Sequence, residues 1–149
     1  MTPAQQLAGF IAKFDPKIGK VVRSARAALR KRWPTAVELV YDNYNALAIG
    51  FAPNERTSEV MVSLAVFARG VNLYFMYGAR LADPRGLLTG SGNQGRFIRL
   101  DDVALLKEPG VVALLRAAER LGKTPLPTTG RGHLVIKSVS ARQRPRRPN

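Results

Sequence analysis

The fold of this chain is decided by the stretch VMVSLAVFARGVNLYFMY, residues 60–77. Two runs rich in Val, Leu, Phe and Tyr alternate with a period of two, and Ala68-Arg69-Gly70 between them has the composition of a tight turn. This turn also interrupts the apolar run, which therefore lacks the unbroken length of about 20 residues that a membrane helix needs. The stretch predicts two antiparallel strands, residues 59–67 and 71–77.

The same period of two recurs on both sides of this hairpin. Alternating apolar residues cover 37–41 and 47–51 with a turn-rich segment between them, and a shorter run at 96–100 follows a long loop. Consecutive strands with short polar connections usually pair with their neighbours in the sequence. The pattern therefore predicts an antiparallel meander of about five strands.

Three other segments have a helical period. Apolar residues recur at helical spacing over 3–13, over 16–32 and over 109–121. Asp15-Pro16 places an N-cap before a proline at the first helical position, and Gly122 follows the third segment where a C-terminal cap belongs. The predicted fold class is α+β: two N-terminal helices, the sheet and one C-terminal helix, with the helices packed on one face.

The composition changes after Gly122. Residues 123–149 are rich in Pro, Thr, Gly and Arg and contain no carboxylate. Proline and arginine oppose the formation of a core, so residues 141–149 are expected to be disordered in isolation. We therefore expect one domain, residues 1–122, and a basic flexible tail, 123–149, in which only 133–139 is able to form a short docked strand.

Several of these pieces occur in the order of a known family. They are the Asp15-Pro16 helix start, the Trp33-Pro34 passage that leads to Glu38 and Tyr41, the paired strands, the Gly78-Ala79-Arg80-Leu81 loop, and residues 88–100. This combination covers residues 5–121 and resembles the YdhG-like family, domain of unknown function 1801. The resemblance implies a small cytoplasmic α+β domain, and most members have no assigned activity. Some relatives are described as frataxin-like iron chaperones, which handle iron with clustered surface carboxylates.

The chain departs from the iron-chaperone pattern. The region of its two predicted N-terminal helices contains one carboxylate, Asp15, and the second helix is strongly basic. A surface of Lys and Arg repels Fe²⁺ and supplies no hard oxygen ligands. We therefore expect no metal site and no cofactor, and we keep an intracellular iron chaperone as an alternative function.

Charge is the strongest functional signal. The chain has 24 Lys and Arg against 10 Asp and Glu, a formal net charge of +14. Basic residues concentrated on one helix and in the tail indicate a polyanionic partner, and nucleic acid contacted through its phosphates is the most available one. The other interpretation is a solvated helix face on a very basic protein. The predicted polyanion-binding residues are Lys17, Lys20, Arg23, Arg26, Arg30, Lys31, Arg142, Arg144, Arg146 and Arg147.

A glycine-rich segment is the second candidate site. Residues 90–95, GSGNQG, match G-x-G-x-x-G. The segment leads into a predicted strand, however, whereas a dinucleotide site opens a helix. A weaker hypothesis is a small-molecule-binding protein in which the loop amides and two arginines hold one phosphate or carboxylate. The residues of this predicted anion loop are Gly90, Ser91, Gly92, Arg96 and Arg99.

No catalytic constellation is visible in the sequence. Cysteine is absent, His133 is the single histidine, and no serine lies in a G-x-S-x-G context. Glu38 and Asp42 lie four apart on a predicted strand and so share a face, where we expect them to decorate the solvent side of the sheet. We therefore predict a non-enzymatic protein without catalytic residues.

The N-terminal sequence bears on the location of the protein. It has neither the basic region nor the long apolar region of a signal peptide, so we expect a cytoplasmic protein. The apolar stripe of the basic helix is needed for the core, which leaves no apolar face to insert into a membrane surface. We therefore expect no membrane partner, and the oligomeric state stays open.

Overall fold

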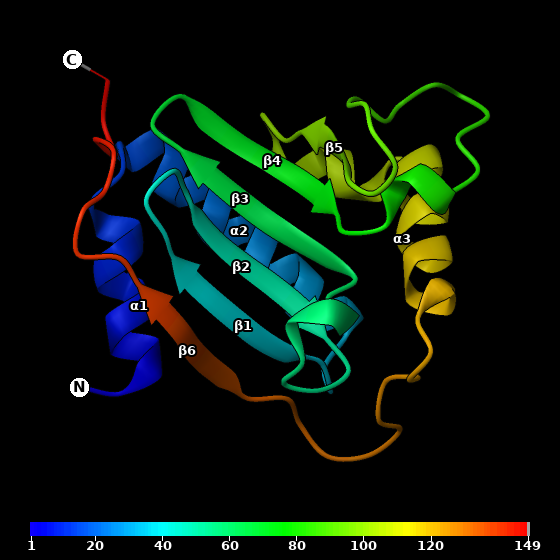
Figure 1. Ribbon diagram of the computed structural model, residues 1–149, viewed down its shortest axis with the longest axis horizontal. Coiled ribbons are helices and arrows are strands. Elements are labelled where there is room, and N and C mark those ends of the chain that lie inside the picture. The colour runs from blue at the N-terminus through cyan, green and yellow to red at the C-terminus, as the bar shows by residue number, and fades with distance from the viewer. Residues whose placement is uncertain (149) are drawn as a thin grey trace.

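One sheet runs through the computed structural model, which describes residues 1–148 (Figure 1). Over these residues the sheet has six strands in the order β5-β4-β3-β2-β1-β6. Their bounds are β1 (Val37–Asp42), β2 (Leu47–Ala52), β3 (Val62–Phe67), β4 (Gly70–Phe75), β5 (Arg96–Arg99) and β6 (Leu134–Val139).

The first five strands form the predicted antiparallel meander. The register of the central hairpin pairs Val62 with Phe75 and Phe67 with Gly70. Gly70 closes the turn with φ of 154°, a region that favours glycine, and a Cβ there would collide with the guanidinium of Arg99. The hairpin that residues 60–77 predict is therefore confirmed, and the backbone conformation at Gly70 favours glycine in its turn.

The sixth strand corrects the predicted strand count of about five. β6 lies at the edge of the sheet and pairs in parallel with β1, from Glu38 opposite Leu134 to Asp42 opposite Val139. A bare edge at β1 would leave backbone N–H and C=O groups unpaired, and the returning chain satisfies them. The docked strand expected within 133–139 is confirmed, and the sheet is a mixed one.

Three α-helices accompany the sheet in the described chain: α1 (Pro3–Ala12), α2 (Pro16–Arg32) and α3 (Pro109–Leu121). Asp15 caps α2, since its side chain accepts a hydrogen bond from the backbone N–H of Lys17 at 3.0 Å. Short 3-10 turns are η1 (Thr57–Glu59), η2 (Gly78–Arg80) and η3 (Val103–Lys107). The predicted order of two helices, sheet and helix is confirmed.

The main core lies between the sheet and the helices. In Figure 1, α2 crosses behind the strands and presents Val22, Ala25 and Leu29 to them, and all three are buried. A second, smaller cluster lies on the other face of the sheet, where Val60 covers Leu39. The helices therefore cover one face of the sheet, as an α+β layer fold requires.

The segment after β6 is packed against the domain, which corrects the expectation of a flexible tail for residues 140–148. The N–H of Ser140 donates to the carbonyl of Asp42 at 2.8 Å, and the N–H of Arg144 donates to the carbonyl of Tyr44 at 2.9 Å. Figure 1 shows this segment running alongside α1. Asn149, which the expectation included, lies outside the described residues.

Candidate functional site

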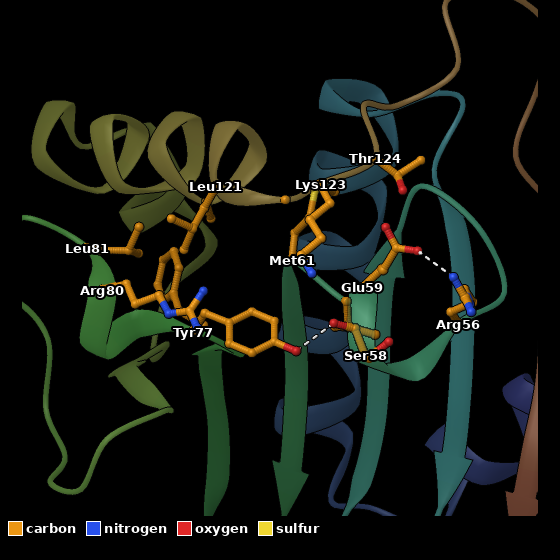
Figure 2. A pocket seen from close by; sticks show the side chains of 14 residues that line it. Arg56, Ser58, Glu59, Met61, Tyr77, Arg80, Leu81, Leu121, Lys123 and Thr124 are labelled. Carbon is orange, nitrogen blue, oxygen red and sulfur yellow. Dashed lines mark hydrogen bonds and ion pairs between the residues drawn. The ribbon is translucent and has the colours of Figure 1, made fainter.

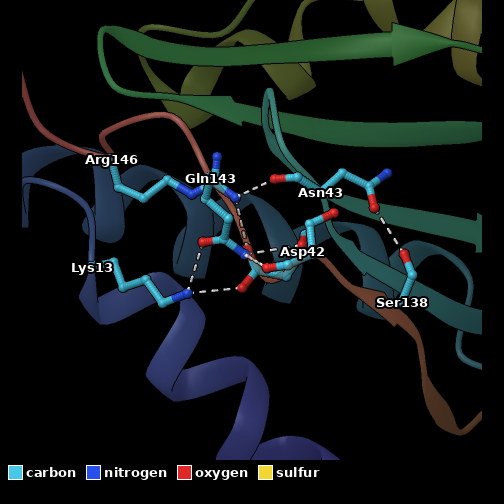
Figure 3. A network of polar contacts seen from close by, with 7 residues as sticks. Lys13, Asp42, Asn43, Ser138, Gln143 and Arg146 are labelled. Carbon is cyan, nitrogen blue, oxygen red and sulfur yellow. Dashed lines mark hydrogen bonds and ion pairs between the residues drawn. The ribbon is translucent and has the colours of Figure 1, made fainter.

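A buried polar network holds the C-terminal segment in place (Figure 3). Asp42 at the end of β1 is fully buried, and its two carboxylate oxygens accept hydrogen bonds of 2.9 Å from Lys13 Nζ and from Arg146 Nη2. Arg146 also donates to the carbonyl of Asn43 at 2.6 Å, and its guanidinium lies 5.5 Å from the ring centroid of Phe14. One carboxylate therefore joins α1, β1 and the C-terminal segment.

The surroundings of Asp42 keep it ionised. Burial alone would raise the pKa of this carboxyl, but the polar side chains of Lys13, Gln143 and Arg146 more than offset burial and lower the pKa. Gln143 additionally donates to the backbone carbonyl of Asp42 at 3.0 Å. Asp42 is therefore a structural anion with its cations in place.

Glu38, the second residue of β1, has the same kind of environment. It is 5% exposed, and its carboxylate accepts hydrogen bonds from Arg26 Nε at 2.6 Å and Arg26 Nη2 at 3.1 Å. The expectation that Glu38 and Asp42 decorate the solvent side of the sheet is wrong. They share a face as predicted, but that face is turned toward the helices, where basic side chains compensate the burial of each charge.

The network brings the two predicted basic blocks together. Arg147, next to the buried Arg146, donates through Nε to the carbonyl of Lys13 at 3.2 Å, three residues before the start of α2. Residues 1–32 and 140–148, which build this corner, contain Asp15 as their single carboxylate, and Asp15 is occupied in capping α2. We call this surface the basic end, formed by the exposed side chains of Lys17, Lys20, Arg23, Arg142, Arg144 and Arg147.

Other predicted polyanion-binding residues are engaged elsewhere. Arg146 is only 6% exposed and is held by Asp42, so it has no surface to offer. Arg26 is paired with Glu38, and Arg30 lies 3.5 Å from the same carboxylate. Lys31 is exposed in the last turn of α2, at the opposite end of that helix from the basic end.

Arg96 donates its hydrogen bonds to carbonyl groups of the glycine-rich loop itself. Arg96 donates to the carbonyls of Gly95 at 2.7 Å, Gly92 at 2.9 Å and Ser91 at 3.1 Å. Arg99 donates to Asp101 at 3.0 Å and to the carbonyl of Arg69. These bonds turn carbonyl oxygens, not amides, toward the guanidinium of Arg96. The geometry gives no support to an anion site formed by Gly90, Ser91, Gly92, Arg96 and Arg99.

A cavity of about 400 Å³ lies at a different place, between the end of α3, η1 and η2 (Figure 2). Its apolar lining includes Met61, Phe75 and Leu121. The Tyr77 hydroxyl donates to the carbonyl of Ser58 at 2.6 Å and so fixes one wall. The volume falls in the range of small-molecule pockets, which are mostly apolar with a few fixed polar groups.

Charged groups surround this cavity. The pKa of Glu59 is held below its usual range, chiefly by hydrogen bonds from the side chains of Thr124 and Asn54. The nearby cations Arg56 and Lys123 lower it further, so Glu59 is ionised. Arg80 lies 5.4 Å from the centroid of the Tyr77 ring, a cation–π contact. The lining comes from three segments far apart in the sequence, and for that reason periodicity and motifs gave no signal for it.

Residues 1–148 provide neither a cluster of metal ligands nor a membrane-spanning helix. No group of three or more His, Cys, Asp or Glu is placed to hold a metal ion there. His133 Nε2 lies 3.1 Å from a carboxylate oxygen of Glu55, and both side chains are exposed. None of the helices over the same residues has the length and apolar character to cross a membrane.

Fold and site together define a small α+β domain with a strongly basic end and a separate cavity. Comparison of the chain with protein-family models, with curated proteins and with solved structures finds no match. The resemblance to the YdhG-like family therefore stays a prediction.

Proposed function

We propose that this chain is a YdhG-like, non-enzymatic binding protein of the cytoplasm that holds an anionic polymer, most readily nucleic acid, through the basic end. The observation that carries the proposal is the docking of the C-terminal segment beside α1 by Asp42 and Arg146. This docking places Arg147 against the carbonyl of Lys13, three residues before the start of α2, the helix that carries Lys17 and Lys20. A fixed cluster of cations loses less side-chain entropy on binding a phosphate backbone than a mobile tail does.

The chemistry of the basic end suits phosphates and offers little for base recognition. Lysine and arginine neutralise backbone phosphates and release counterions, which gives affinity without sequence preference. Glu38 and Asp42 are buried and paired with basic side chains, so their negative charges do not face the ligand. The proposal is therefore one of contact through phosphates.

The test is the fluorescence anisotropy of a labelled duplex and a labelled single strand titrated with the full chain over a range of salt concentrations. We expect binding that weakens steeply with salt, with a slope of log K against log salt of about −4 for a duplex if about four to five phosphates are contacted. A slope near zero, or no binding at low salt, would contradict the proposal and leave the charge as a solubility feature.

The full chain is needed for this measurement. A truncation after Gly122 would remove β6, which pairs with β1, and Arg146, which neutralises Asp42. Loss of binding in such a fragment would follow from unfolding as well as from loss of the tail. Point substitutions of exposed cations separate the two causes.

The cavity favours a second candidate function, the binding of an amphipathic small anion. Met61 and Leu121 offer an apolar contact, while Arg80 and Lys123 offer cations at the mouth. We expect anilinonaphthalene sulfonate to bind saturably with a rise in fluorescence. Leu121 is 37% exposed, so Leu121→Asp should leave the fold intact and weaken this binding by about tenfold, through lost apolar contact and charge repulsion.

Val139→Asp is the matched control for this cavity, because Val139 is also an exposed apolar residue and lies on β6. The control should bind the probe as the native chain does. Equal affinity in Leu121→Asp and the native chain would count against the cavity as the binding place.

The iron-chaperone alternative finds no donor set in residues 1–148. Asp42 and Glu38 are committed to basic side chains, and Glu59 sits among Arg56, Lys123 and Asn54. Hard divalent cations need several oxygen ligands that converge on one point. We therefore do not propose iron transfer.

A further inference from the structure

We propose that a groove between the end of α2 and α3 is a phosphate-binding site formed by Arg32, Arg116 and Arg120. The groove has a volume of about 350 Å³ and is lined by these three arginines and Glu119. It lies at the opposite end of α2 from the basic end, and α2 is 17 residues long, about 25 Å. The proposal does not rest on polymer binding at the basic end.

The fold brings these side chains together. Arg116 and Arg120 are four residues apart on α3 and therefore lie on the same side of that helix. Arg32 comes from the last turn of α2 and lines the same groove. The three arginines thus line one groove from two helices that are far apart in the sequence.

The groove keeps an excess of positive charge within the described chain, because three arginines line it against one carboxylate, Glu119. Over residues 1–148, none of the three guanidinium groups has a carboxylate within 4.0 Å. The nearest acid on the lining, Glu119, accepts a hydrogen bond of 2.7 Å from the indole Nε1 of Trp33. Like charges four apart on a helix repel each other, so this arrangement gains from a bound anion.

The helix dipole does not account for the cluster. Arg32 and Arg120 lie in the last turns of their helices, where a cation is favoured by the carbonyl ends. Arg116 lies a turn earlier on α3, outside the reach of that effect, and still faces the groove. A ligand for all three arginines explains the convergence.

Arg32 is partly buried beside Trp33. Its guanidinium lies 6.0 Å from the centroid of the Trp33 ring, and its Nε is buried without a hydrogen-bond acceptor. Trp33 itself is only 3% exposed and is held by Glu119. Planar guanidinium groups that are fixed in place bind phosphate oxygens in pairs, so a tetrahedral oxyanion fits this chemistry.

The phosphate has two sources with the same chemistry: a free phosphorylated small molecule, or a phosphate of a polymer that runs along α2. Inorganic phosphate and pyrophosphate are the probes for the shared chemistry. The single tryptophan of the chain, Trp33, reports on the groove, because it contacts both Arg32 and Glu119.

The experiment titrates the full chain with each probe at low salt and follows tryptophan fluorescence and binding heat. We expect saturable binding, and a loss of about tenfold or more in affinity in the double variant Arg116→Gln, Arg120→Gln, because each charge-assisted hydrogen bond contributes strongly. The control is Arg85→Gln, Lys107→Gln, which removes the same charge from exposed residues outside the groove and should bind as the native chain does.

The absence of saturable binding, or equal affinity in the groove variant and the control, would overturn the proposal. The source is decided by a labelled oligonucleotide in the same buffers. If polymer binding weakens in the groove variant and pyrophosphate competes, the polymer supplies the phosphate. If pyrophosphate binds in the groove while polymer binding is unchanged, or absent altogether, the site serves a free phosphorylated compound.

Discussion

Asp42→Asn is expected to lower the free energy of unfolding by about 3–5 kcal/mol, because removal of one partner of a buried ion pair leaves its charge uncompensated. Asp42 is 1% exposed and Arg146 is 5% exposed at their side chains, so water cannot replace the lost carboxylate. Asparagine keeps the size of the side chain, which separates the loss of charge from the creation of a cavity. The measurement is chemical denaturation of both proteins.

Asp101→Asn is the control for this loss of stability. Asp101 is 79% exposed and lies 3.0 Å from Arg99, an ion pair at the surface. Surface pairs contribute about 0–1 kcal/mol, so the control should differ little from the native chain. If Asp42→Asn cost no more than Asp101→Asn, the network in Figure 3 would not be what anchors the C-terminal segment.

The same pair of proteins should differ in their response to acid. The pKa of Asp42 is lowered in the folded state, so its contribution to stability is present above the pKa of the unfolded chain, about 4, and is lost as the pH falls through the folded value. The native chain should therefore lose stability below about pH 4. Asp42→Asn has no carboxyl at this position and should lack that part of the loss.

Local signals were sufficient for most of the fold. The start of α2 is determined locally by Asp15-Pro16, an N-cap followed by a proline, and the predicted helix 16–32 has the observed bounds. The hairpin at 60–77 is likewise encoded by its own turn. β6 was harder to predict from the sequence. Residues 134–136 form a short apolar run, but nothing in this run indicates that it pairs with β1 or that the pairing is parallel.

The site was less accessible to sequence reasoning than the fold. Arg146 and Arg147 are adjacent and chemically identical, yet one is buried on Asp42 and the other is exposed. Which of them becomes buried depends on a carboxylate about a hundred residues earlier in the chain. Composition gives the sign of the charge in this region, and only the tertiary structure says which cations are available.

The cavity and the arginine groove were also not predictable from the sequence, because tertiary structure brings their residues together. Arg32 meets Arg116 and Arg120 only because α2 and α3 end near one another, and the lining of the cavity is gathered from η1, η2 and the end of α3. Motif searches depend on fixed spacing along one segment. Sites that are assembled from several elements have no such spacing.

Replacement of four cations of the basic end by glutamine is expected to weaken oligonucleotide binding by about a thousandfold or more near 0.1 M salt, because each neutralised phosphate contributes about 0.9 to the salt slope. The variant is Lys17→Gln, Lys20→Gln, Arg144→Gln, Arg147→Gln. All four side chains are exposed and glutamine is a good helix former, so the fold should persist. The salt slope should fall by about 3 to 4.

The distribution of this loss decides whether the helix and the C-terminal segment act as one surface. The control carries glutamine at Arg69, Arg85, Lys107 and Arg131, which are exposed cations outside the basic end, and so removes the same net charge. Net charge acts on any polyanion regardless of position, whereas contact requires proximity, so equal weakening in both variants would contradict a defined surface. For one continuous surface, the pair at Lys17 and Lys20 and the pair at Arg144 and Arg147 should each account for about half of the change in slope. Such a division is expected from docking of the C-terminal segment by Arg146, because the neighbouring Arg147 then contacts the carbonyl of Lys13, just before the helix that carries Lys17 and Lys20.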